Sequence, residues 1–307
     1  MKFSHICTMS QENLKKALEA ELKKSYEKVI SDDGYLYADG KFPVLLVAHM
    51  DTVHKKLPSH IIYTENGNKV SSPNGIGGDD RCGVYMILEV IKKYNCSVLF
   101  CEDEEVGGVG AEKFVSSPLA NGLNFNYIIE FDRKGSNDAV FYNCDNEEFE
   151  EFITKDFYKT AYGSFSDISV IAPELKCAAV NLSCGYYNAH TEKEYVLISE
   201  MRKSIEEACK ILERTTEKDV FEYIEAERYY RYGGGWYNND YYDYYNSSSS
   251  YLRKYFMIEY CDKEGKHHWD DYFAKSEEEA VGKFCIEHSD ICFDDIVEIY
   301  YENDVYY

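Results

Sequence analysis

The sequence predicts an α/β domain whose central sheet is covered by helices on both faces, followed by a linker and a small α+β appendage. Three observations lead to this prediction. Compact apolar runs alternate with amphipathic segments over residues 1–216, a stretch rich in Tyr, Gly, Asn and Ser interrupts both patterns, and residues 251–307 resume them on a smaller scale. Strands that alternate with helices along a chain are typical of a sheet between helical layers.

Three amphipathic segments predict the long helices of the first section. Residues 11–30 follow Ser10, which is suited to cap a helix N-terminus, and carry apolar or small residues near the helical period. Residues 80–94 keep an apolar face and end in lysines, which interact favourably with a helix C-terminus. Residues 199–218 are expected to form the last of these helices.

Four compact apolar runs predict strands. Residues 41–50 are almost continuously apolar, as expected for a buried central strand. Residues 96–101, 125–131 and 176–184 are similar β-type runs. Together with the helices they predict a first domain over residues 1–216.

The last third of the chain changes character. Residues 229–250 have neither period, so we predict a linker over residues 217–250. Residues 251–307 contain two β-type runs around the sequence DKEGK, a helical start capped by Ser276 and a final strand. This ββαβ pattern predicts a small appendage and indicates no particular role for it.

Composition excludes several classes of function. The formal net charge of -23 argues against nucleic acid or an anionic membrane as the main partner, because both favour a basic surface. No apolar run has the length of a membrane span, and the first residues contain no apolar signal segment. The 11 cysteines include no CxxC pair, so we expect free thiols in a reduced, cytoplasmic protein.

Histidines and carboxylates stand where the predicted strands end. They are His49, Asp51, Glu104, Glu105, Asp132 and His190, together with Asp79 and Asp80 in a glycine-rich loop before the second helix. Each alone has a simpler interpretation; Asp80, for example, suits a helix N-cap. Ligands of open α/β sheets bind at the carboxyl ends of strands, so we expect these side chains to converge there. His54 and His60 follow in a polar loop and are expected at the surface.

A divalent cation would explain such a cluster. Carboxylates packed together repel one another and are costly to bury without a partner. Mixed imidazole and carboxylate ligands suit zinc, with manganese or cobalt as alternatives. Two ions that share a bridging carboxylate need five protein ligands, which this set can supply.

The order of the blocks HMD, GGDDRCG, EDEEVGGVGA, EFDR and NAHT resembles the co-catalytic dizinc exopeptidase superfamily, which includes leucine-type and glutamyl aminopeptidases, peptidase T and related carboxypeptidases and deacylases. The resemblance covers roughly residues 40–200. It implies a mixed central sheet and two zinc ions. The first ion would be held by His49 and Asp132. The second would be held by His190 and Glu105, and Asp79 would bridge both.

The resemblance also implies roles beside the metal ligands. Glu104 would be the general base that accepts a proton from a zinc-activated water, and Asp51 would hold the ring of His49. The physical chemistry agrees, because neighbouring side chains diverge and only one of Glu104 and Glu105 can easily reach the same ion. A carboxylate that bonds the second ring nitrogen of a ligating histidine fixes its tautomer.

Many members of the superfamily insert a lid domain between ligand blocks, and here the intervals between His49 and Asp79 and between Asp132 and His190 are too short for one. The sequence therefore predicts a compact metallopeptidase that acts on a peptide or small amide substrate, with aminopeptidase activity as the leading function. Two alternatives stay open. One is a deacylase or amidohydrolase of acylated amino acids or small peptides, and the other is a non-catalytic binding scaffold of the same fold.

Overall fold

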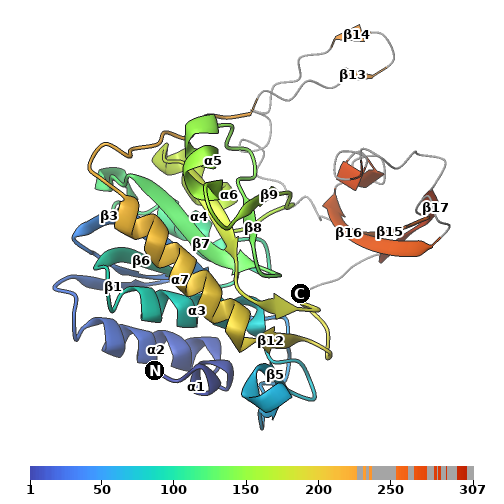
Figure 1. Cartoon of the computed structure of the whole chain (residues 1–307), viewed down its shortest axis with the longest axis horizontal. Helices are drawn as coiled ribbons and strands as arrows, with labels where there is room; N and C mark the ends of the chain where they lie inside the picture. Colours follow the sequence, from blue (N-terminus) through green and yellow to red (C-terminus); the bar gives the residue numbers. More distant parts are fainter. Residues whose placement is uncertain are drawn as a thin grey trace. The chain divides into compact units, whose positions relative to one another are not determined.

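The computed structural model divides the chain into two units, Met1–Ala226 and Glu227–Tyr307. The residues that the structure describes are 1–226, 231–232, 235–236, 254–261, 266–274, 280–281, 283–284, 288 and 296–302. Each unit has its own sheet, and each is described by itself (Figure 1).

The first unit is built on an eight-stranded mixed sheet in the order β1-β2-β6-β3-β7-β10-β8-β9. Its strands are β1 (Val29–Asp32), β2 (Tyr35–Ala38), β3 (Phe42–His49), β6 (Cys96–Cys101), β7 (Tyr127–Arg133), β8 (Asp138–Val140), β9 (Lys159–Ala161) and β10 (Ala179–Ser183). The central strands β6, β3, β7 and β10 run parallel, whereas β2 and β8 pair antiparallel with them. The predicted mixed sheet is confirmed, and each of the four predicted strands lies at its centre.

Helices cover both faces of this sheet, as predicted (Figure 1). One face carries α1 (Phe3–Cys7), α2 (Gln11–Leu22), α3 (Gly78–Val90), α5 (Glu147–Thr154) and α7 (Ile198–Arg214), and the other carries α4 (Val109–Val115) and α6 (Ile168–Leu175). Along β3, Leu46 and Ala48 belong to the first hydrophobic cluster, and Leu45 and Val47 belong to the second. This alternation explains why the strand is apolar throughout: both of its faces are buried.

The first predicted helix is too long. It begins as expected, with the Ser10 hydroxyl accepting the Asn13 N–H, but α2 ends at Leu22. Residues 29–32 instead form β1, which pairs with β2 in an antiparallel hairpin. Tyr26, between the two elements, is buried and donates its hydroxyl to the carbonyl of Cys96. The hairpin and this anchor outweigh the helical pattern of the segment.

A small second sheet in the order β11-β12-β5-β4 lies in the same unit. Its strands are β4 (Ile62–Thr64), β5 (Lys69–Ser71), β11 (Tyr186–Tyr187) and β12 (Tyr195–Leu197), and two short 3₁₀ turns occur at η1 (Glu65–Gly67) and η2 (Ala120–Gly122). The interval between His49 and Asp79 thus contributes one short hairpin, which confirms the predicted lack of an inserted lid domain.

The first unit extends beyond the predicted end at residue 216. Residues 217–226, assigned to the linker from the sequence, pack onto it: Phe221 is buried, its N–H donates to Asn126, and its carbonyl accepts from Ala178. The ring of Phe221 lies 5.2 Å from that of Phe149. An aromatic side chain with backbone partners on both sides gives this segment a fixed place that its polar composition does not suggest.

In the second unit, β15 (Lys254–Cys261), β16 (His267–Ala274) and β17 (Ile296–Glu302) form an antiparallel sheet in the order β16-β15-β17. Its described core includes Phe256, Ile258, Tyr272 and Phe284. Most of the Tyr-rich segment lies outside the described residues, apart from β13 (Arg231–Tyr232) and β14 (Gly235–Trp236). The separate roles predicted for the domains stay predictions.

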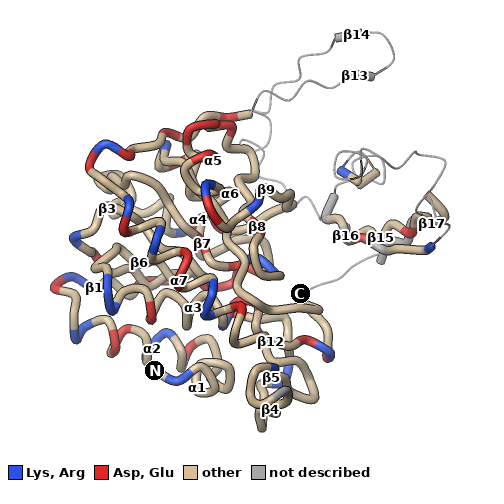
Figure 2. Tube along the Cα trace, viewed as in Figure 1, with Lys and Arg blue, Asp and Glu red and all other residues tan. Residues whose placement is uncertain are grey.

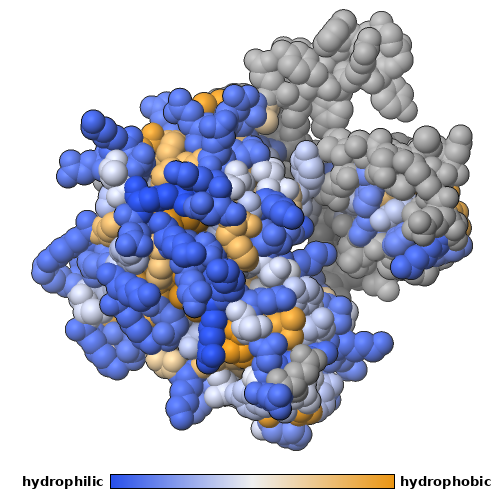
Figure 3. Space-filling model, in the orientation of Figure 1, coloured by the Kyte–Doolittle hydropathy of each residue, from blue (hydrophilic) through white to orange (hydrophobic). Residues whose placement is uncertain are grey.

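Among the described residues, no helix combines the length and apolar character needed to cross a bilayer. The cysteines described are free, and all but Cys261 are buried. Figure 2 shows a run of glutamates on α5 and mixed charges along α7, so the acidic surplus is spread over the first unit. The visible face of that unit is mainly hydrophilic, with small separate apolar areas (Figure 3).

Candidate metal centre and active site

The predicted ligands meet at the carboxyl ends of the parallel strands. His49 is the last residue of β3, and Asp132 lies near the end of β7. Glu104 and Glu105 follow β6, and Asp79 stands at the start of α3. The turn after β11 adds His190, so five separate segments supply the cluster.

Asp79 stands between the two histidines. Its Oδ1 lies 3.2 Å from Nε2 of His49, and its Oδ2 lies 3.1 Å from Nε2 of His190. One carboxylate thus faces two imidazoles with different oxygens. This is the arrangement expected of a bridging ligand.

Each histidine has a further carboxylate of its own. Nε2 of His49 lies 3.4 Å from Oδ1 of Asp132, and Nε2 of His190 lies 3.2 Å from Oε2 of Glu105. Oε2 of Glu104 is farther from the His49 nitrogen, at 4.0 Å. The two adjacent glutamates therefore diverge, as predicted, with Glu105 beside a histidine and Glu104 set back.

The two halves of the cluster differ in depth. The side chain of His49 is fully buried, whereas that of His190 is 52% exposed. His49, at the end of a central strand, is enclosed by the protein. His190, on a surface turn, is in contact with solvent. The cluster is therefore open on the His190 side.

Asp51 supports this cluster from behind. Its Oδ1 lies 3.0 Å from Nδ1 of His49 and also accepts the N–H of Glu104 at 3.1 Å. Its Oδ2 accepts the N–H of Glu105 at 3.1 Å. One carboxylate thus orients a ring on β3 and the backbone that carries both glutamates. Sequence reasoning anticipated the first contact and missed the other two.

The donor set fits a divalent cation. Oε1 of Glu105 and Oδ1 of Asp132 are buried and have no hydrogen-bond partner. Nδ1 of His49 is taken up by Asp51, so Nε2 is the ring nitrogen that could ligate a cation. Buried carboxylate oxygens without a partner are costly in a protein interior, and a bound cation would remove that cost.

Two overlapping groups of side chains have the spacing of a metal site: His49, Asp79 and Glu105, and His49, Asp80 and Asp132. Both oxygens of Asp80 already accept backbone hydrogen bonds. Its Oδ2 accepts the backbone N–H of His49, and its Oδ1 accepts the backbone N–H of Gly83. The second bond caps the helical run that follows, as the sequence suggested for Asp80. Asp79, whose side chain faces both rings, is the better ligand.

Burial and neighbouring charges shift the pKa values of the cluster. Burial and the charge of Asp79 raise the pKa of Asp132 to about 7. Burial also raises the pKa of Glu104 well above its usual range, against the opposing effect of His49. For His190, burial lowers the pKa, but hydrogen bonds to Asp79 and Glu105 outweigh it and raise the pKa to about 11. Without a cation, the cluster therefore holds extra protons.

Sequence reasoning missed several side chains next to the cluster. Gln11 and Asp103 form a pair of hydrogen bonds, Gln11 Nε2 to Asp103 Oδ1 at 2.9 Å and Asp103 N–H to Gln11 Oε1 at 3.2 Å. They hold the residue just before Glu104. His54, expected at the surface, is instead nearly buried and bonds to the buried Glu194. Periodicity does not reveal these contacts, because each joins residues that are far apart in the chain.

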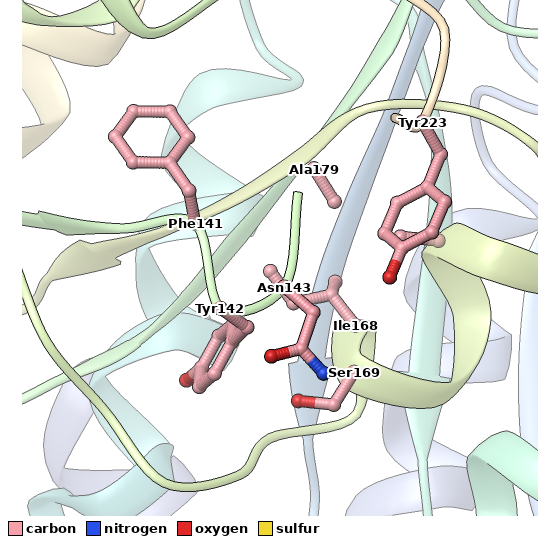
Figure 4. A pocket seen from close by; sticks show the side chains of 8 residues that line it. Phe141, Tyr142, Asn143, Ile168, Ser169, Ala179 and Tyr223 are labelled. Atoms are coloured by element: carbon pink, nitrogen blue, oxygen red, sulfur yellow. The ribbon is translucent and has the colours of Figure 1, made fainter. Parts of the chain in front are cut away.

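A small cavity elsewhere in the unit is separate from this cluster. It is lined by Phe141, Tyr142, Asn143, Ile168, Ser169, Ala172, Ala179 and Tyr223 (Figure 4). None of these residues belongs to the predicted ligand set, and the side chains of Asn143 and Ser169 point toward each other there.

Residues 36–174 match the family described as Peptidase family M28. No curated protein matches the chain significantly.

Among solved structures, the chain is similar to the aminopeptidase PepT from Bacillus cereus, with 16% identity and a TM-score of 0.56 over 69% of this chain and 96% of that one. A tripeptidase from Staphylococcus aureus has 14% identity and a TM-score of 0.54, covering 68% and 95%. The TET aminopeptidase from a marine sediment Thaumarchaeota archaeon has 11% identity and a TM-score of 0.56, covering 71% and 97%. At these identities the likeness concerns the fold.

The family match agrees with the class of enzyme expected from the motifs, a metal-dependent exopeptidase that hydrolyses peptide bonds, and confirms it at that level. The matched region contains four of the five predicted metal ligands, and the fifth, His190, lies beyond its end. The match to Peptidase family M28 covers less than half of the chain, and it supports the resemblance of the ligand blocks to the co-catalytic dizinc exopeptidases.

Proposed function

We propose that this chain is an aminopeptidase that uses two zinc ions, with manganese or cobalt as alternative metals. One ion would be held by His49 and Asp132, and the other by His190 and Glu105. Asp79 would be shared between them. The observation that carries the proposal is the position of Asp79, whose two oxygens face different histidines at 3.2 Å and 3.1 Å.

A bound zinc ion supplies Lewis acidity, which polarises a carbonyl group and makes a water molecule more acidic. The chain supplies the rest. Glu104 accepts a proton from the attacking water and returns it to the departing amine nitrogen as the peptide bond breaks. Burial raises the pKa of Glu104 above its usual range, which favours the return of the proton to the departing amine.

Asp51 positions these groups. It holds Nδ1 of His49, so that Nε2 faces the cluster, and it receives the N–H groups of Glu104 and Glu105. The base and its neighbouring ligand therefore share one support. That shared support keeps Glu104 close to the metal ligands without making it one of them.

The solved structures that share this fold support an aminopeptidase over a carboxypeptidase. They include an aminopeptidase from Bacillus cereus, a tripeptidase from Staphylococcus aureus and the TET aminopeptidase from a Thaumarchaeota archaeon.

A panel of fluorogenic aminoacyl amides tests the proposal, run beside amino-terminally acetylated versions and acylated amino acids. We expect cleavage of the free-amine substrates and none of the blocked ones, because a blocked amine is desolvated without gaining a partner. Cleavage of acylated amino acids alone would assign the chain to the deacylases. A zinc-loaded protein that cleaves neither series would favour a binding scaffold.

A further inference from the structure

Glu194 is a fully buried carboxylate outside the ligand set, and it accepts hydrogen bonds from three groups. Its Oε2 accepts the N–H of Gly77 at 2.7 Å and bonds to Nε2 of His54 at 2.7 Å. Its Oε1 accepts the N–H of Asp79 at 3.1 Å. Two of its three partners are therefore backbone groups of the loop that presents the shared ligand.

Glu194 and His190 belong to the same short turn. The N–H of Glu194 donates to the carbonyl of Thr191 at 3.1 Å, which closes the turn directly after the histidine. The turn carrying His190 thus reaches across and holds the main chain of Asp79, while the His190 ring faces the Asp79 side chain. The two ligands are joined twice, once through side chains and once through Glu194.

The residues around this contact are closely packed. A Cβ added at Gly78 would lie 2.9 Å from Tyr186 and from Val196, and 3.4 Å from Oε1 of Glu194. A Cβ at Gly75, where φ is +82°, would lie 2.1 Å from the ring of His54. The loop therefore passes close to the turn because glycines allow it, and Glu194 fixes it there.

We propose that Glu194 is a positioning residue that sets the distance between Asp79 and His190, and thereby the affinity for the ion that these two ligands hold. The inference rests on the proposed function for the identity of that ion. A carboxylate is required because each of its oxygens receives at least one donor. An amide in its place presents an NH2 group to one side and leaves at least one buried N–H without an acceptor.

The variant Glu194→Gln tests this, with Glu192→Gln as the matched control, because Glu192 lies in the same turn and is exposed. The first measurement is hydrogen exchange in the metal-free full-length protein over residues 75–82. We expect faster exchange at the amides of Gly77 and Asp79 in Glu194→Gln and no change in the control. Unchanged exchange in Glu194→Gln would overturn the inference, and this result does not depend on any metal.

The second measurement is a zinc titration of the metal-free proteins by calorimetry. We expect the binding step assigned to His190 to weaken roughly 10- to 100-fold in Glu194→Gln, the range seen when a group supporting a metal ligand is removed, with the step assigned to His49 changed less. Excess zinc should restore kcat. Equal affinities in variant and control would also overturn the inference.

The two failures are distinguishable. If the unaltered protein binds no transition metal, the proposed function is wrong, and the exchange measurement alone decides whether Glu194 holds the Asp79 loop. If the unaltered protein binds zinc and the variant binds it equally well, only the inference is wrong. Should Glu194→Gln fail to fold, Glu194→Asp keeps both acceptors but withdraws them from the loop, and we expect the same effects with smaller size.

Discussion

Oδ1 of Asp51 lies 3.0 Å from Nδ1 of His49, whereas the other ring nitrogen, Nε2, faces the cluster. The same carboxylate receives the backbone of Glu104 and Glu105. A residue two positions after a strand-end histidine therefore does two jobs, since it selects the tautomer of one ligand and anchors the loop that carries another ligand and the proposed base.

Asp51→Asn should weaken metal binding at both positions. The side-chain amide of asparagine has one oxygen, which accepts, and one NH2 group, which does not. Either the ring of His49 or the backbone of the glutamate loop therefore loses its acceptor. We expect zinc affinity to fall about 10- to 100-fold, measured by calorimetry. The exposed Asp145, changed in the same way, serves as the control. Unaltered affinity in Asp51→Asn would show that the contact is not needed to orient the ligands.

Glu104→Gln and Glu105→Gln should have opposite signatures. The first removes the proposed base and no ligand, so kcat should fall at least about 100-fold while metal content stays near that of the unaltered protein. The second removes a ligand, so metal content should fall. Elemental analysis and initial rates on the same samples separate the two effects. Near-normal hydrolysis by Glu104→Gln would mean that the roles of the pair are assigned wrongly.

The metal-free protein should lose stability as the pH rises. The folded-state pKa of Asp132 is raised from 3.8 to about 7, and that of His190 from 6.5 to about 11. A group whose pKa is higher in the folded state stabilises it fully below the unfolded pKa, and this contribution is lost as the pH rises through the folded pKa. The contribution of Asp132 is lost between pH 3.8 and about 7, and that of His190 between pH 6.5 and about 11. The range from about pH 5 to about pH 8 therefore includes part of each loss. The opposite shift of Asp79, a lowered pKa, acts only at more acidic pH.

The measurement is the Tm of chelator-treated protein across that range, compared with the zinc-loaded protein. We expect the metal-free Tm to fall with increasing pH and the difference between the two forms to widen, because a bound cation replaces the protons that the cluster otherwise holds. A metal-free Tm that rises over the same range would contradict the raised pKa values.

A chain that ends after Ala226 should fold and bind metal, whereas one that ends at Thr216 should be markedly less stable. The longer form keeps Phe221, whose ring lies 5.2 Å from those of Phe149 and Phe152. Loss of a buried Phe side chain costs about 3–5 kcal/mol, and the shorter form also loses backbone hydrogen bonds. Urea unfolding of both chains measures the difference. Equal stability would show that residues 217–226 contribute nothing to the first unit.

The centre of the fold was predictable because its strands are buried on both faces. A run such as residues 41–50 has no other stable place than the middle of a covered sheet, and the polar residues at its end then mark the site. The short outer strands β8 and β9 and the helices α4 to α6 were not predicted. They have three to eight residues each and too few turns or alternations to show a period.

The convergence of the predicted ligands was predictable from their order in the chain, but the side chains that support them were not. Glu194 lies in the polar stretch TEKE, which also contains the exposed Glu192, so the sequence alone does not distinguish the two glutamates. Only the fold distinguishes a carboxylate that receives backbone donors from one that faces water. Gln11 is a similar case, since it lies in an amphipathic helix and its partner Asp103 is far along the chain. Contacts of this kind depend on tertiary packing, which local patterns do not encode.

The unequal depth of the two histidines has a kinetic consequence. A cation beside the half-exposed His190 can exchange ligands with water stepwise, whereas one beside the buried His49 must first displace the groups that cover it. Under the proposed assignment, the outer position should therefore fill and empty faster than the inner one. Such a centre can be loaded with two different metals in sequence, and partial chelation should yield a half-loaded species with the deeper ion still in place.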